Sequence, residues 1–262
     1  MLLTGKKLLI FLCIGLYSFN GTSKNRAFEC KGNIADSIGG FVVAELFTSE
    51  GCSSCPPADA LAARLLESYP ENVFVLGFHV DYWDYLGWKD NFSNSAYSRR
   101  QQQYGNIFHL NSVYTPQVVI NGSEEFVGSD QSKLYSTVDQ NLKLKQKKTI
   151  SVSASVSGEK ININYTVIDL GKTTKINFAL VQLHAESKVQ RGENRGSILK
   201  HVNVVRDFIT VPSSQINGQL QLPLPAGLSK NDLAIIAFAQ DDISWKITSA
   251  SKWLIVYTIA FI

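Results

Sequence analysis

The chain has 262 residues, of which 18% are charged, and its formal net charge is +3. About 240 residues beyond an N-terminal signal suit one large domain or two small ones. The weak positive charge does not indicate nucleic-acid binding, because the one lysine cluster, at residues 143–148, lies where a predicted helix ends and a strand begins.

The N-terminus has the pattern of a secretory signal peptide, assigned to residues 1–22. Lys6 and Lys7 precede an apolar run at residues 8–17, and small or polar residues follow. The run is too short to span a bilayer comfortably, so no stable membrane span is expected after cleavage, although an uncleaved anchor is the alternative. The expected location is therefore secreted or periplasmic.

Three cysteines remain once Cys13 is removed with the signal. Export implies an oxidising compartment, in which a disulfide between Cys52 and Cys55 can persist. Cys30 is then either a free thiol or a transient partner of that pair.

The first half of the mature chain predicts an α/β thioredoxin-like domain over residues 38–148. Strands and helices alternate, and a strand ending at an Asn-Gly turn signal precedes the last helix. The predicted strands are 41–47, 73–80 and 117–121, and the predicted helices are 57–69, 93–104 and 129–146.

The second half predicts an all-β antiparallel sandwich domain over residues 149–262. Short alternating strands are separated by Gly, Pro and Asn. The join at residues 147–149 lacks the Gly/Ser or Pro richness of a flexible linker, so the two domains are expected to stay docked. The predicted strands are 150–156, 160–169, 176–184, 202–210, 218–222 and 233–241, with residues 253–262 as a last strand or a tail.

Cys52 and Cys55 form a Cys-x-x-Cys pair at a strand-to-helix turn, the arrangement used for thiol–disulfide exchange. The N–H groups at the helix start favour a thiolate at Cys52, and Cys55 lies close enough to resolve a mixed disulfide. Half of a zinc site is the alternative, although no second cysteine pair has zinc spacing. We therefore assign no metal ligands and no cofactor.

Thr115 and Pro116 open the strand after the crossover, where a cis proline would lie beside the disulfide. A trans proline opening a strand is the alternative. We place both residues with the cysteines as catalytic candidates, in the role of holding a substrate chain.

Residues 78–90 are rich in aromatic and acidic side chains and leave the end of a predicted strand. Trp83 and Trp88 are candidates for gripping a substrate, with a packed aromatic loop as the alternative. Asp81 is a candidate for proton handling, and so is Glu45 if strand alternation turns it toward the cysteines. Glu50 is expected to be exposed, and His79 is interpreted as a core histidine.

A polar segment at residues 191–196 precedes the strand beginning near His201. It is interpreted as a charged surface loop, with docking on the first domain or ligand binding as alternatives.

Four segments together resemble a bacterial secreted family catalogued as domain of unknown function 1223. They are residues 45–59, 78–90, 113–116 and 192–206. The resemblance covers roughly residues 40–250 and implies a thioredoxin-like fold with a redox site, but no established substrate. The chain departs from the thioredoxin pattern at Gly51, where an aromatic residue usually precedes the first cysteine.

These observations predict an exported thiol–disulfide oxidoreductase. Its expected partners are exported proteins or small thiols and disulfides, together with a redox partner protein. The first alternative is a secreted binding protein with a structural Cys52–Cys55 disulfide. The second is a copper or zinc carrier that uses both thiols, together with His79.

Overall fold

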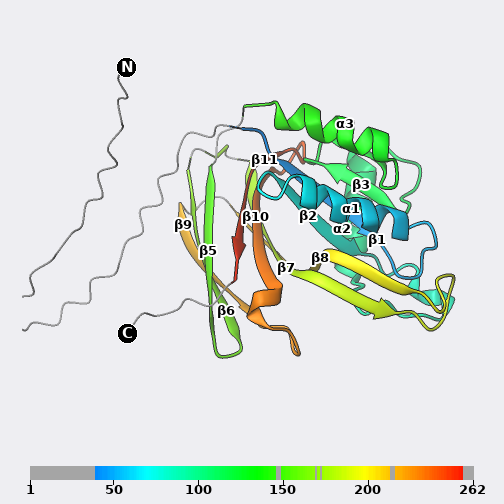
Figure 1. Cartoon of the computed structure of the whole chain (residues 1–262). Helices are drawn as coiled ribbons and strands as arrows, with labels where there is room; N and C mark the ends of the chain where they lie inside the picture. The colour runs from blue at the N-terminus through cyan, green and yellow to red at the C-terminus, as the bar shows by residue number, and fades with distance from the viewer. Residues whose placement is uncertain (1–38, 146–148, 169, 172, 213–215, 256–262) are drawn as a thin grey trace, which may run out of the picture. The chain divides into compact units, whose positions relative to one another are not determined.

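The computed structural model describes residues 39–255, apart from 146–148, 169, 172 and 213–215. The predicted signal peptide, Cys13, Cys30 and residues 256–262 lie outside the described part. Among the described residues there are 11 strands, three α-helices and two short 3-10 helices (Figure 1). No helix within these ranges is long and apolar enough to cross a bilayer.

The elements of the first half lie close to their predicted positions. Pro56 begins α1, while the side chains of Asn94 and Asp130 cap α2 and α3. Asn121 and Gly122 both have positive φ, as the Asn-Gly signal predicts for a tight hairpin turn. The elements are β1 (Val42–Thr48), α1 (Pro56–Ser68), β2 (Val73–His79), η1 (Asp84–Leu86), α2 (Ser95–Ile107), β3 (Gln117–Ile120), β4 (Glu124–Val127) and α3 (Gln131–Leu142).

The second half is built from strands, two of which are much longer than predicted. The final described strand ends at Leu254, and most of the predicted last strand or tail at residues 253–262 lies outside the described residues. The elements are β5 (Ile150–Ser157), β6 (Lys160–Val167), β7 (Thr174–Lys188), β8 (Ile198–Pro212), β9 (Asn217–Pro223), η2 (Lys230–Asp232), β10 (Leu233–Asp241) and β11 (Ile247–Leu254).

One mixed sheet of eight strands contains strands from both halves of the chain, in the order β11-β10-β7-β8-β2-β1-β3-β4. β1 and β2 are parallel, and β8 joins β2 in parallel where Val204 pairs with Gly77. The remaining pairs in this sheet are antiparallel. A separate three-stranded sheet has the order β5-β6-β9.

The predicted fold class, a thioredoxin-like domain followed by a separate antiparallel sandwich, is therefore wrong. The large sheet crosses the expected boundary at residue 148, because β8 supplies the neighbour for the open edge of β2. Hydrophobic periodicity indicates that a segment is a strand but not which backbone edge it pairs with, so the local patterns could not reveal this junction.

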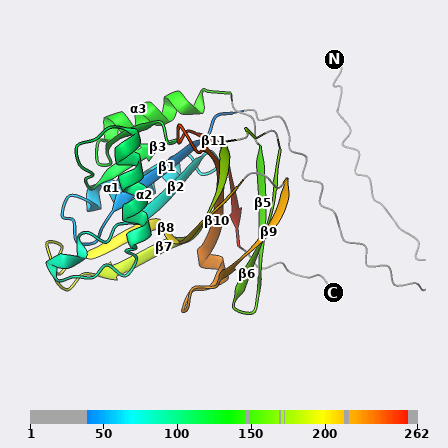
Figure 2. The ribbon, with the colours of Figure 1, turned by 180° about the vertical axis from the view of Figure 1, so that it is seen from behind.

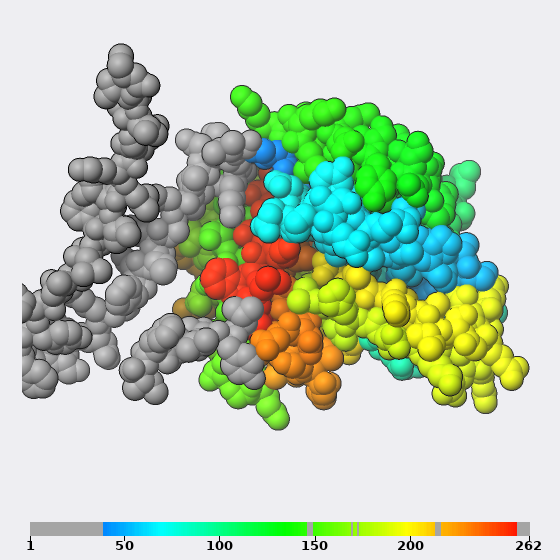
Figure 3. Space-filling view, in the orientation of Figure 1, coloured from blue at the N-terminus to red at the C-terminus, as the bar shows by residue number. Residues whose placement is uncertain are grey.

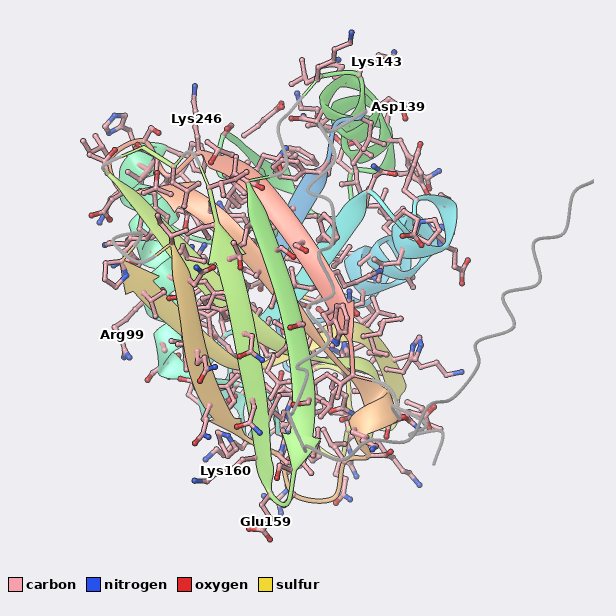
Figure 4. The ribbon with its side chains drawn as sticks, turned by 90° about the vertical axis from the view of Figure 1, so that its left-hand side faces the viewer. Arg99, Asp139, Lys143, Glu159, Lys160 and Lys246 are labelled. Atoms are coloured by element: carbon pink, nitrogen blue, oxygen red, sulfur yellow. A yellow bond between two sulfur atoms is a disulfide. The ribbon has the colours of Figure 1, made fainter. Side chains whose placement is uncertain are left out.

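Alternating side chains divide the core between the two faces of the large sheet. One face carries Phe78, Val205 and Phe238 in a continuous cluster with Tyr97 and Tyr104 of α2. Figure 2 shows α2 lying over this face of the large sheet. The other face is covered by α1 and α3 over β1 and β3, and by the small sheet over β7 and β10. Figure 4 shows the small sheet face-on, with Glu159 in the turn between β5 and β6 and Lys160 at the start of β6.

We predict that a chain ending at residue 148 does not fold cooperatively. Truncation removes the β8 neighbour of β2 and half of the cluster around Phe78. Thermal unfolding followed by circular dichroism tests this, with a chain ending at residue 255 as the matched control. A sharp, reversible transition in the shorter chain would show that the first half is an independent domain.

Candidate functional site

The Cys52–Cys55 disulfide closes the turn between β1 and α1. Cys55 is the N-cap residue of α1 and has helical dihedral angles, and its carbonyl accepts hydrogen bonds from Ala58 and Asp59. Both cysteines are 0% exposed, whereas Ser53 and Ser54 between them are exposed. The disulfide is therefore at a helix N-terminus, as the motif predicts, but its sulfur atoms are covered.

The tip of the β7–β8 hairpin, residues 189–197, which we call the hairpin tip, is hydrogen-bonded to this turn. The amide of Asn194 donates hydrogen bonds to the carbonyls of Glu50 and Cys52, each at 2.9 Å. Glu193 accepts the backbone N–H of Ser53 at 3.0 Å, and hydrogen bonds from Ser53 lower the pKa of this carboxyl. This polar segment was interpreted as a charged surface loop, and the structure instead shows the alternative, contact with the first half of the chain.

The two candidate tryptophans lie beside the disulfide turn, but each indole N–H is bonded within the protein. Trp83 donates to the hydroxyl of Thr115 at 2.8 Å, and Trp88 donates to the carboxylate of Glu50 at 2.7 Å. A Cβ atom at Gly51 would meet Trp83 at 3.0 Å. Trp83 thus occupies the space beside Gly51, and these contacts fit the packed-loop interpretation.

The Thr115–Pro116 peptide bond is cis, as predicted. The Ser54 hydroxyl donates to the carbonyl of Thr115 at 3.4 Å, so this loop contacts the segment between the two cysteines. The structure brings Cys52, Cys55, Thr115 and Pro116 into one neighbourhood around Ser54.

Glu45 lies elsewhere. Strand alternation turns its side chain to the α2 face of the sheet, with Val43 and Phe47, and away from α1. Arg100 binds the carboxylate through two nitrogens, at 2.5 and 2.9 Å, and the Tyr104 hydroxyl donates to it at 2.5 Å. Both carboxylate oxygens are thus used in a buried ion pair.

Asp81 is half-buried and directed toward α2. Its backbone N–H and its carboxylate both bond the Ser98 hydroxyl, at 3.1 and 2.5 Å. The assignment of Asp81 to proton handling remains a prediction.

The sequence analysis did not identify a buried group of acids and histidines near the disulfide turn. Glu50 is 0% exposed, which contradicts its expected exposure, and His79 and Asp90 are 1% exposed. The Asp90 carboxylate lies 2.6 Å from His79 Nδ1 and accepts the backbone N–H of Glu50 at 2.9 Å. His201 of β8 completes the group, with its ring 4.7 Å from that of His79.

His79 and Asp90 form a buried ion pair. Burial alone lowers the pKa of His79, but the charge and hydrogen bond of Asp90, together with the charges of Asp59 and Glu50, outweigh burial and raise it. Burial alone raises the pKa of Asp90, but the charge and hydrogen bond of His79, together with the backbone N–H groups of Glu50 and Phe92, outweigh burial and lower it. Interpreting His79 as a core histidine was correct, but the sequence did not identify its partner.

Asp59 and His201 extend the group along α1 and β8. Asp59 Oδ2 lies 3.5 Å from His201 Nδ1 and accepts the Thr48 hydroxyl at 3.3 Å. Among the described residues, no three His, Cys, Asp or Glu side chains are arranged to hold a metal ion. The spacing of Asp59, one helical turn after Cys55, is the sequence signal that could have identified this acid.

Comparisons with known proteins place the sequence but not its activity. A family model described as "Protein of unknown function (DUF1223)" matches residues 43–240, so the resemblance found in the sequence is confirmed. The thioredoxin-like fold that the resemblance implied is not confirmed. No curated protein matches the chain.

Among solved structures, a protein from Agrobacterium tumefaciens is 27% identical with a TM-score of 0.63, covering 83% of this chain and 95% of that one. A DUF3823 family protein from Bacteroides ovatus is 14% identical with a TM-score of 0.27, covering 41% and 53%. A domain of the outer membrane lipoprotein Omp28 from Porphyromonas gingivalis is 14% identical with a TM-score of 0.25, covering 40% and 93%. The last two scores are too low to carry an argument.

We predict that Asp90→Asn lowers the free energy of unfolding by about 3–5 kcal/mol, because it leaves His79 buried without its counter-ion. Because the pKa of His79 is raised above its ordinary value of 6.5, the ion pair contributes fully to the free energy of unfolding below pH 6.5. This contribution is lost as the pH rises through the folded-state pKa of His79. The deficit of the variant should therefore shrink at alkaline pH.

Urea denaturation at a series of pH values measures this deficit. Asp81→Asn is the matched control, since Asp81 bonds a serine and its effect should not vary across the range in which His79 titrates. A deficit for Asp90→Asn that is constant with pH would contradict the ion pair.

We predict that Asn194→Ala accelerates reduction of the disulfide by a small thiol. The substitution removes the two hydrogen bonds that Asn194 donates to the disulfide turn, and it should lower the free energy of unfolding by about 1–3 kcal/mol. Timed alkylation followed by peptide mass analysis measures the rate. Arg195→Ala, at an exposed neighbour, is the control, and equal rates in the two variants would show that Asn194 does not limit access.

Proposed function

We propose that this chain, which belongs to the DUF1223 family of proteins of unknown function, exchanges electrons between its Cys52–Cys55 pair and thiols or disulfides of other molecules. The observation that carries the proposal is the disulfide at the start of α1. Donors at a helix start stabilise a thiolate, which is the attacking and the leaving form of a cysteine. Buried acids and a histidine pair lie around the same turn.

In the direction that reduces a substrate, the Cys52 thiolate attacks a substrate disulfide, and one substrate sulfur leaves as a thiolate. Cys55 loses its proton and attacks Cys52 Sγ, which releases the second substrate thiolate and restores the protein disulfide. Two electrons pass to the substrate, and a redox partner protein must return them. Thr115 and Pro116, beside Ser54, would hold an extended substrate chain.

Export belongs to the same proposal. A disulfide persists in oxidising compartments, so a secreted or periplasmic protein fits the bonded Cys52–Cys55 pair. Exported proteins or small thiols would then be the substrates.

One observation favours a second function, that of a binding protein with a static disulfide. Both cysteines are buried, and Asn194 holds the turn closed. In this case the disulfide stabilises the loop that carries Trp83 and Trp88, and ligand binding would occur there.

An equilibrium titration of the disulfide against glutathione tests the proposal. An exchange protein should show a potential above about −300 mV, whereas a structural disulfide typically lies below it. The titration uses a chain with Cys13→Ser and Cys30→Ser, so that only one pair reports. In a second arm, Cys55→Ser should trap mixed disulfides through Cys52, with the Cys52→Ser, Cys55→Ser double variant as the control. A potential below that range without trapping would support the static disulfide.

A further inference from the structure

Asp59 is the acid that α1 places beside Cys55. Cys55 has helical dihedral angles, and Asp59 follows four residues later, so both side chains project from the same face of the helix, with Cβ atoms about 5–6 Å apart. Both residues are buried, at 0% and 7% exposure. Glu45, the acid first expected near the cysteines, is instead bound to Arg100 on the other face of the sheet.

His201 lies between two carboxylates without a hydrogen bond to either. Its Nδ1 is 3.5 Å from Asp59 and its Nε2 is 3.8 Å from Glu50. Both ring nitrogens and Glu50 Oε1 are buried and have no hydrogen-bond partner in the part of the chain that the structure describes. Unpaired buried polar groups are costly to stability and call for an explanation. A ring poised between two acids can accept a proton from one side and release it on the other.

A groove connects this pair to solvent. α1 lies along β8, as the space-filling view shows (Figure 3), and between them is a groove of about 780 Å³. Pro56, Asp59 and His201 all line it. The groove therefore reaches the first turn of α1 without passing the hairpin tip that is bonded to the disulfide turn.

We propose that Asp59 takes the proton from the Cys55 thiol during exchange and that His201 passes it to the groove. The inference rests on the proposed exchange activity. When Cys55 attacks Cys52 Sγ, its S–H bond breaks, the proton moves to Asp59, and the sulfur electron pair forms the new S–S bond. In the opposite direction an incoming thiolate attacks Cys52 Sγ, the S–S bond breaks toward Cys55, and Asp59 returns the proton to Cys55.

Other charged and titratable groups face this pair from every element around it. The buried ones set the field in which the proton moves and can shift the pH dependence, whereas solvent screens the charges of the exposed ones, Glu67 among them. They are Glu50 after β1, His79 on β2, Asp90 after η1, Glu67 on α1, His184 and Glu186 on β7, and Lys200 on β8.

Reaction of the reduced protein with an aromatic disulfide, 5,5′-dithiobis(2-nitrobenzoate), separates the two steps. In a chain with Cys13→Ser and Cys30→Ser, the first coloured thiolate is released when Cys52 attacks, and the second when Cys55 attacks. Asp59→Asn should slow the second release by about 100-fold at neutral pH and leave the first unchanged. The deficit should shrink as the pH approaches about 8.5, where a thiol ionises without a base.

Glu67→Gln is the matched control, because Glu67 lines the same groove on the same helix but is exposed. It should leave both releases unchanged. An unaffected second release in Asp59→Asn, or a deficit of the same size at every pH, would overturn the proposal.

His201→Ala provides a second test that does not depend on the folding of the Asp59 variant. It should slow the second release, and added imidazole, which can enter the groove, should restore it. A purely structural role for His201 would give no rescue. The assay starts from reduced protein and an artificial disulfide, so it reports on Asp59 even if the glutathione titration shows that the native disulfide resists reduction.

Discussion

The β7–β8 hairpin is the element on which the rest of the structure depends. Its two strands are each 15 residues long. β7 pairs with β10 on one side of the hairpin, and β8 pairs with β2 on the other side. Because β8 lies directly beside β2, the two halves of the chain share one sheet and one hydrophobic cluster. The same hairpin extends past the sheet and brings Glu193 and Asn194 onto the disulfide turn. The site is therefore assembled from residues about 140 positions apart.

Three buried histidine or arginine side chains differ in whether they are hydrogen-bonded to a neighbouring acid. Arg100 and His79 each have a bonded acid, Glu45 and Asp90, and these pairs lie on or beside the sheet as parts of the core. His201 has two acids near it and hydrogen bonds to neither. A bonded pair holds its proton, whereas an unbonded ring between acids can exchange one. The difference in hydrogen bonding makes His201, rather than Arg100 or His79, the group suited to moving a proton.

Closure of the site has a chemical consequence. The hairpin tip is hydrogen-bonded to the backbone of Cys52, while the groove beside α1 reaches Asp59 and His201 and is not lined by the hairpin tip. A substrate and a proton would thus use separate routes. Excluding water from the sulfur atoms lowers the local dielectric constant, and this strengthens the electrostatic effect of the neighbouring acids. A small polar contact such as that of Asn194 can then govern access without changing the chemistry underneath.

Local patterns in the sequence determined the elements and the disulfide turn. Pro56 after Cys55, the Asn121-Gly122 turn and the Thr115-Pro116 pair each act within a few residues, so periodicity and turn chemistry predicted them correctly. The tertiary structure alone decided that β8 pairs with β2, since backbone hydrogen bonds between distant strands leave no local pattern. It also decided the environment of each acid. Because side chains alternate along β1, Glu45 lies against Arg100 on the α2 face of the sheet. Asp59 lies one helical turn after Cys55, and His201 of β8 lies beside it. The burial of Glu50 has the same origin, because Trp88 and the hairpin tip cover it from distant parts of the chain.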